Sequence, residues 1–168
     1  MSHASASRSL APDDGRTPAQ WYCLIAGLLL LLVGVLGFIS DSQFDTGEGI
    51  DGDLFLGLEV NGIHNLIHVA SGLVLLAASP RRSSARAVAI AFGAVYGVVA
   101  IIGLVDGSDV LGLFPVNPAD NVLHVALSAL GILAGAISRS DDRRLDRGAA
   151  GDRLQRDTAA TQRERTSR

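Results

Sequence analysis

Four apolar stretches, each long enough to cross a lipid bilayer, constrain the fold of this chain more than any other feature. They cover residues 21–40, 58–79, 87–105 and 116–137, and a transmembrane helix needs about 20 apolar residues. The composition agrees, because 48% of the 168 residues are hydrophobic and only 18% are charged. Open strands cannot satisfy their backbone groups in lipid, so these stretches must be helices. We therefore predict an all-α protein with a four-helix transmembrane domain over residues 21–138.

The segments on either side of this domain have a different composition. Residues 1–20 are rich in Ser, Ala, Asp and Pro, and residues 139–168 are rich in Arg, Asp, Ala and Thr. Neither segment has enough apolar residues to form a core, so we expect both to be disordered. No small-residue cleavage site follows the first stretch, which ends Gly37-Phe38-Ile39-Ser40-Asp41. We expect a retained membrane anchor there, not a cleaved signal peptide.

The distribution of arginine predicts the orientation in the membrane. Residues 41–57 and 106–115 contain no basic residue but seven acidic ones. The loop between the second and third stretches contains Arg81, Arg82 and Arg86, and the C-terminal segment contains nine arginines. Basic residues favour the cytoplasmic side. We therefore expect both termini in the cytoplasm and both acidic loops outside.

Residues 60–70 align without a gap on residues 116–126, with identical residues at six positions. The identical pairs are Val60/Val116, Asn61/Asn117, Asn65/Asn121, His68/His124, Val69/Val125 and Ala70/Ala126. Each half of the domain contains two spans, so a repeat of this kind enters the membrane in the same direction twice. This predicts two parallel, tandem helical hairpins in one bundle. Small-residue motifs such as Gly93-x-x-x-Gly97 and Gly131-x-x-x-Gly135 favour close helix contact, within one chain or in a homo- or hetero-oligomer.

Each copy of the repeat places four polar residues on one face of a helix, at the outer end of a span. At about 100° per residue they fall within a narrow arc, and lipid would leave them without hydrogen-bond partners. We therefore expect the two faces to turn inward and form one polar cluster. Its members are Asn61, His64, Asn65 and His68 in the second span and Asn117, Asp120, Asn121 and His124 in the fourth.

The first interpretation of this polar cluster is structural. Amide and imidazole groups can hydrogen-bond between helices, and Asn61 and Asn117 can cap the helices that follow them. The protein is then a non-enzymatic membrane component that needs no cofactor, and its cluster stabilises the bundle or binds a small ligand.

Three other interpretations give the cluster a chemical role. His64 and His68, with Asp120 and His124, have the i, i+4 spacing of ligands for Zn²⁺ or another divalent first-row metal. Asn65 stands where a metalloprotease helix has its general base, so proteolysis is not expected. The equivalent His68 and His124 could instead bind haem as a pair. The histidines and Asp120 could also relay protons or pass a small solute.

These motifs together resemble a family of small bacterial membrane proteins catalogued as domain of unknown function 4383. The matching residues are Gly34–Phe38, Asn61-x-x-His64-Asn65-x-x-His68, Tyr96-Gly97 and Asn117-x-x-Asp120-Asn121-x-x-His124. The likeness covers about residues 20–138. One departure is Gly62, where the second copy of the motif has Pro118, and a helix start tolerates either residue. It implies a four-span protein of the bacterial cytoplasmic membrane and assigns no activity, substrate or cofactor. We expect the lipid bilayer as partner and no nucleic acid; a subunit role in a larger membrane complex stays open.

Overall fold

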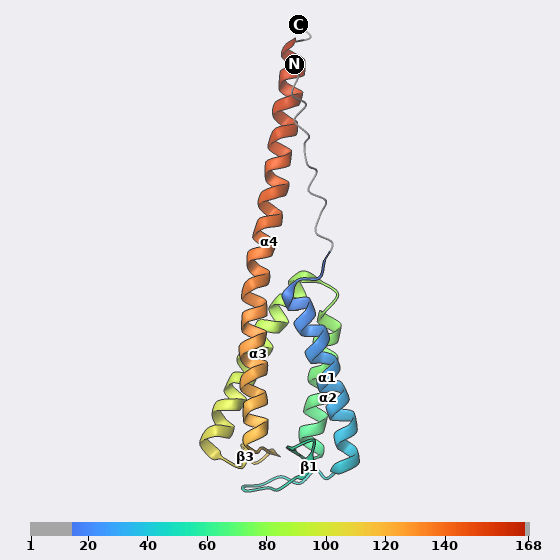
Figure 1. The fold of residues 1–168 in the computed structure, drawn as a ribbon, viewed down its shortest axis with the longest axis vertical. Helices are drawn as coiled ribbons and strands as arrows, with labels where there is room; N and C mark the ends of the chain where they lie inside the picture. Colours follow the sequence, from blue (N-terminus) through green and yellow to red (C-terminus); the bar gives the residue numbers. More distant parts are fainter. Residues whose placement is uncertain (1–14, 167–168) are drawn as a thin grey trace, which may run out of the picture.

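The computed structural model describes residues 15–166, although the side chains of most residues after Ser138 lie outside that description. Four helices and two short β-hairpins follow one another along the chain (Figure 1). In order they are α1 (Pro18–Ser40), β1 (Asp53–Phe55), β2 (Leu58–Val60), α2 (Gly62–Ala78), α3 (Arg82–Asp106), β3 (Asp109–Val110), β4 (Phe114–Pro115) and α4 (Pro118–Thr166). The predicted all-α class is confirmed, with the hairpins as small additions.

The helices pack mainly in two antiparallel pairs, α1 with α2 and α3 with α4 (Figure 1). Both β-hairpins lie at one end of these pairs, and the start of α1 and the α2–α3 turn lie at the other. Glycines let the backbones approach closely within each pair. A Cβ at Gly34 would lie 2.7 Å from the Asn65 carbonyl oxygen, and one at Gly93 would lie 2.8 Å from that of Ser128. Both contacts are tighter than a side chain tolerates, so these positions require glycine.

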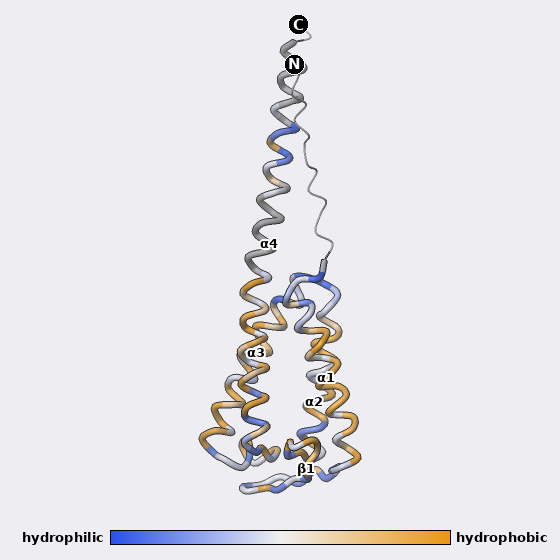
Figure 2. The backbone as a smooth tube through the Cα atoms, in the orientation of Figure 1, coloured by the Kyte–Doolittle hydropathy of each residue, from blue (hydrophilic) through white to orange (hydrophobic). Residues whose placement is uncertain are grey.

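Three of the described helices are long and apolar enough to cross a membrane. They are α1, α3 and the Pro118–Ser138 part of α4, whereas α2 is a shorter apolar helix of 17 residues. Large aliphatic side chains point outward from them; Leu28, Ile101 and Val122, for example, are all more than half exposed. Figure 2, in which the backbone is coloured by hydropathy, shows mostly hydrophobic residues along the helices and hydrophilic positions near the hairpin end of α2 and α4. These helices are those of a membrane protein.

The helix boundaries differ from the predicted ones where capping or turns decide them. Thr17 caps α1 and forms a capping box with Gln20, so the helix begins at Pro18. The second stretch was expected to be helical from residue 58, but residues 58–60 form β2 and the helix begins only after Asn61. The fourth begins at Pro118 instead of residue 116, and α3 begins at Arg82, before the predicted residue 87.

The acidic loops contain β-hairpins, which the sequence analysis did not predict. In the first, Phe55 pairs with Leu58 across a turn formed by Leu56 and Gly57, both with positive φ. Such a two-residue turn follows the twist of an antiparallel pair. In the second, Val110 pairs with Phe114, and Leu111-Gly112 again has positive φ. A buried valine directly precedes the first asparagine of each polar motif: Val60 is the last residue of β2, and Val116 follows the end of β4.

The C-terminal segment is also helical where disorder was expected. Helix α4 continues to Thr166, so the prediction of a disordered tail over residues 139–168 is wrong for residues 139–166. Pro80 follows the end of α2, but no proline follows the apolar part of α4. The segment also contains good helix formers and an i, i+4 ion pair of 2.8 Å between Asp152 and Arg156. Of the N-terminal segment predicted to be disordered, residues 1–14 lie outside the described residues.

Candidate functional site

The eight predicted polar residues gather at the hairpin end of the molecule, where α2 and α4 begin. Seven of them are buried and Asn117 is partly buried. The ring centroids of His64 and His68 lie 4.4 Å apart, and those of His64 and His124 lie 6.0 Å apart. Side chains of the first helix pair therefore meet a side chain of the second inside the protein.

The two asparagines that open the motifs cap the helices. Asn61 Oδ1 accepts a hydrogen bond of 2.8 Å from the His64 backbone N–H, and Asn61 is the N-cap of α2. Asn117 Oδ1 accepts bonds from the backbone N–H groups of Ala119 and Asp120, at 2.8 and 3.1 Å. The predicted capping role of both asparagines is confirmed, because each satisfies N–H groups that a helix start leaves without partners.

Asp120 connects the two halves of the protein through backbone groups. Its Oδ2 accepts one hydrogen bond from the Asn117 N–H and one from the Glu59 N–H, both of 2.9 Å. The first bond, together with the Asn117 cap, makes a reciprocal capping arrangement at the start of α4. The second ties α4 to strand β2. Asp120 is not part of the group of side chains that share a common centre with the histidines.

The second asparagine of each motif faces a glycine on the neighbouring helix. Asn65 Nδ2 donates a 2.9 Å hydrogen bond to the Asp41 carbonyl oxygen, which closes the end of α1. Its Oδ1 lies where a Cβ at Gly37 would be, and Asn121 Oδ1 lies in the same way against Gly103. Both oxygens are buried and have no hydrogen-bond partner among the described residues. These asparagines therefore fix how closely each helix pair packs.

The three histidines behave differently from the asparagines and the aspartate. His64 Nδ1 lies 2.9 Å from the Glu59 carbonyl oxygen, and since a carbonyl only accepts, Nδ1 carries the proton and Nε2 has a free lone pair. His64 Nε2, both ring nitrogens of His68 and Nδ1 of His124 are buried without a hydrogen-bond partner in the described part of the chain. One ring nitrogen from each of the three residues lies within 4.8 Å of the other two. One ring nitrogen from each of three buried histidines therefore lies close enough to the other two for the three to share an ion after small movements.

Two aromatic rings that were not predicted as site residues flank these histidines. The Phe114 ring, from β4, has its centroid 4.9 Å from that of His64. The Tyr96 ring, from α3, lies 5.4 Å from His124 at an interplanar angle of 80°, and its hydroxyl contacts Ser71 Oγ at 3.4 Å. Glu59 was missed as well, and it leaves no sequence signal because it acts through its backbone.

An apolar groove of about 430 Å³ lies apart from the histidines, between α1 and α4. Aliphatic residues such as Ala26, Leu29 and Leu130 line it, and no member of the polar cluster does. The groove therefore gives no evidence of an organic ligand at the cluster.

Residues 20–137 match the family described as Domain of unknown function (DUF4383). The chain belongs to this family. The resemblance seen in the motifs is thereby confirmed. The matched range contains all eight polar residues. It ends at residue 137, close to the end of the membrane-length part of α4 at Ser138, so the C-terminal extension of α4 lies outside the match. No match was found among curated proteins or among solved structures.

Proposed function

We propose that this DUF4383 protein is a four-span membrane protein that binds one transition-metal ion through His64, His68 and His124 near the outer face of the membrane. The observation that carries the proposal is the convergence of three buried imidazoles, each with a ring nitrogen within 4.8 Å of the other two. The proposal is for a binding protein and includes no catalytic step.

A purely structural role explains the other cluster residues better than it explains the histidines. Asn61, Asn117 and Asp120 make the capping and cross-linking hydrogen bonds that such a role requires. His68 makes no hydrogen bond in the described part of the chain. A buried polar atom without a partner is costly, and nearly all such atoms in proteins are satisfied. A shared metal ion would give a partner to one ring nitrogen of each histidine.

Imidazole is a suitable ligand for Zn²⁺, copper and other first-row metals. Bond lengths of about 2.0–2.1 Å place the ligand nitrogens about 3.3 Å apart, so the widest pair would have to close by up to about 1.5 Å. Small ring rotations supply such a movement. The Glu59 carbonyl, hydrogen-bonded to His64 Nδ1, is the kind of outer partner that orients a metal-binding histidine. A haem would use only His68 and His124 as its pair of ligands. Because the His64 ring lies beside both of them, a single ion bound by all three is a better candidate than haem.

We further propose that α2 is the fourth span and that the two helix pairs arose as a tandem repeat. At 17 residues α2 is about 26 Å long, slightly less than the roughly 30 Å hydrocarbon core, and local bilayer thinning accommodates such a mismatch. The repeat is supported by the Leu-Gly turn of each hairpin and by the matching contacts of Asn65 with Gly37 and of Asn121 with Gly103.

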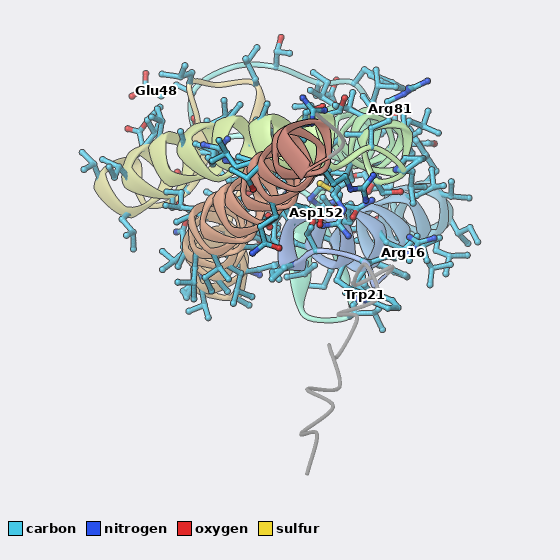
Figure 3. All side chains as sticks on the ribbon, turned by 90° about the horizontal axis from the view of Figure 1, so that it is seen from above. Arg16, Trp21, Glu48, Arg81 and Asp152 are labelled. Carbon is cyan, nitrogen blue, oxygen red and sulfur yellow. The ribbon has the colours of Figure 1, made fainter. Side chains whose placement is uncertain are left out.

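The end at which α1 begins is the proposed cytoplasmic end. In a view from that end, Arg16, Trp21 and Arg81 are labelled around the helix bundle (Figure 3). The Arg16 guanidinium carbon lies 5.6 Å from the Trp21 ring centroid, and tryptophan is enriched at membrane–water interfaces. The opposite end carries the acidic loops. This supports the positive-inside orientation, with both termini in the bacterial cytoplasm.

Metal analysis of the full-length protein in detergent tests the proposed binding. After separate loading with Cu(I), Zn²⁺ or Co²⁺ and removal of free ions, the wild type should retain about one ion per chain with at least one of these metals. His124→Ala should reduce the retained metal to background, and His3→Ala, which removes the remaining histidine of the chain, should not. A monodisperse wild-type protein that retains no ion under any loading condition would refute the proposal.

Cysteine labelling tests the orientation independently. In a Cys23→Ala background, Thr46→Cys in the first acidic loop should react with a membrane-impermeant maleimide in intact spheroplasts. Thr158→Cys in the C-terminal part of α4 should react only after the membrane is opened. The reverse pattern would place the acidic loops in the cytoplasm.

A further inference from the structure

We propose that the ion held by His64, His68 and His124 is monovalent copper, Cu(I), in preference to a divalent metal. This inference rests on the proposed function and adds the charge and the coordination number of the ion. Three features of the site support it: the charge of the ligands, the surroundings that limit a fourth ligand, and the position of one carboxylate.

The ligands are three neutral imidazoles. Among the described residues, the converging group contains histidines alone and no cysteine, aspartate or glutamate. The three side chains are at most 2% exposed, so an ion there leaves water almost completely. The cost of moving an ion into a medium of low dielectric constant grows with the square of its charge, so a divalent ion pays about four times as much as a monovalent one of similar size. Neutral ligands offer no negative charge to offset that difference.

The surroundings also favour three ligands over four. Zn²⁺ sites are almost always four-coordinate and take a water where the protein supplies only three ligands. Phe114 covers His64 and Tyr96 packs edge-on against His124, which limits the room for water. Among the neighbouring oxygen donors, the Tyr96 hydroxyl contacts Ser71 and Asp120 Oδ2 accepts two backbone N–H groups. The Asp120 carboxylate also lies outside the group of atoms that share a common centre with the three histidines. A closed-shell Cu(I) ion is stable with three nitrogen ligands.

Asp120 lies one helical turn before His124 and is 1% exposed. Its Oδ1 has no hydrogen-bond partner among the described residues. One carboxylate beside the site can balance one positive charge, which is the charge of Cu(I) on three neutral ligands. Asp120 therefore acts as a charge-balancing neighbour and is not itself a ligand.

The test compares ions on the full-length protein in detergent under anaerobic conditions. Cu(I) is titrated against a chromogenic Cu(I) chelator and Zn²⁺ against a fluorescent Zn²⁺ chelator. We expect Cu(I) to bind at least 100-fold more tightly, with X-ray absorption showing three nitrogen neighbours. His68→Ala should abolish Cu(I) retention, and Asp120→Asn should weaken Cu(I) binding by about 10–100-fold. Glu48→Gln, an exposed acidic residue at the same end, is the matched control and should have no effect.

The folded fraction of each variant, measured by size-exclusion chromatography and thermal unfolding, corrects for any loss of structure. Equal or tighter binding of Zn²⁺, or a four-coordinate Co²⁺ absorption spectrum at full occupancy, would overturn the assignment to Cu(I) and leave the metal-binding proposal standing. A folded wild type that retains neither ion would overturn both. An Asp120→Asn protein that is folded and binds Cu(I) as tightly as the wild type would remove the charge-balancing role.

Discussion

The two helix pairs share a local framework but differ at one position of the polar motif, where the first has His64 and the second has Asp120. The preceding strands explain the difference. Glu59 in β2 donates its backbone N–H to Asp120 in the other half. The residue aligned with Glu59 is Pro115, which has no N–H to donate. A carboxylate therefore finds two backbone donors at position 120 and would lack one of them at position 64. The same helix start therefore carries a proposed metal ligand, His64, in the first half. In the second half it carries Asp120, whose carboxylate is hydrogen-bonded to the backbone of the first half.

The largest expected effect comes from making the two halves alike. His64→Asp would bury a carboxylate beside Phe114 without the second N–H donor that Asp120 has. We expect a loss of about 3–5 kcal/mol in the free energy of unfolding, the range for a buried charge without a partner, together with loss of the metal. Denaturant unfolding in mild detergent measures it. His64→Asn, which removes the ligand but adds no charge, is the control and should cost less. Equal stability of the two variants would show that Pro115 does not cause the asymmetry.

The sequence was sufficient to predict the helices and the polar cluster, because lipid imposes the rule for both. Apolar length identifies a membrane helix, and a polar stripe in such a helix must turn away from lipid. The sequence alone therefore predicts that Asn65 and His124 are buried away from lipid, as the structure has them.

The hairpins and the division of labour within the cluster could not be predicted in this way. Strands of two or three residues have almost no periodic signal, and the positive φ of Leu56 and Leu111 is uncommon for residues other than glycine. Asp120 is held outside the histidine group by its hydrogen bond to the backbone N–H of Glu59. A pattern of side chains in the sequence cannot predict a contact made by a backbone group. The helical C-terminal segment was missed because composition alone does not show that a preceding helix can continue through it.

An intermediate effect is expected at the paired glycines and tests how alike the helix pairs are. Gly37→Ala and Gly103→Ala would each place a methyl group on an asparagine side-chain oxygen, at Asn65 or Asn121. Such overpacking costs about 1–3 kcal/mol, and we expect a similar loss in both halves by thermal unfolding. Gly148→Ala, where nothing lies within 4 Å, is the control and should be neutral or slightly stabilising. A loss at Gly37 without one at Gly103 would mean that the two pairs pack by different contacts.

The smallest effect separates the two helix caps, which the repeat makes identical in sequence. Asn61 is 2% exposed and caps the N–H of the buried residue His64, whereas Asn117 is partly exposed. Water can replace a lost cap at Asn117 but has little access at Asn61.

Loss of a cap costs about 0.5–2 kcal/mol, so the loss of stability on Asn61→Ala should lie near the upper limit and that on Asn117→Ala near the lower. Asn61→Ser keeps an uncharged acceptor at the cap and should recover part of the loss. Because His64 begins the first turn of α2, Asn61→Ala should also weaken metal retention, and Asn117→Ala should do so less. Equal losses in both measurements would mean that the greater burial of Asn61 does not strengthen its cap, and that the two halves differ at this position in sequence context alone.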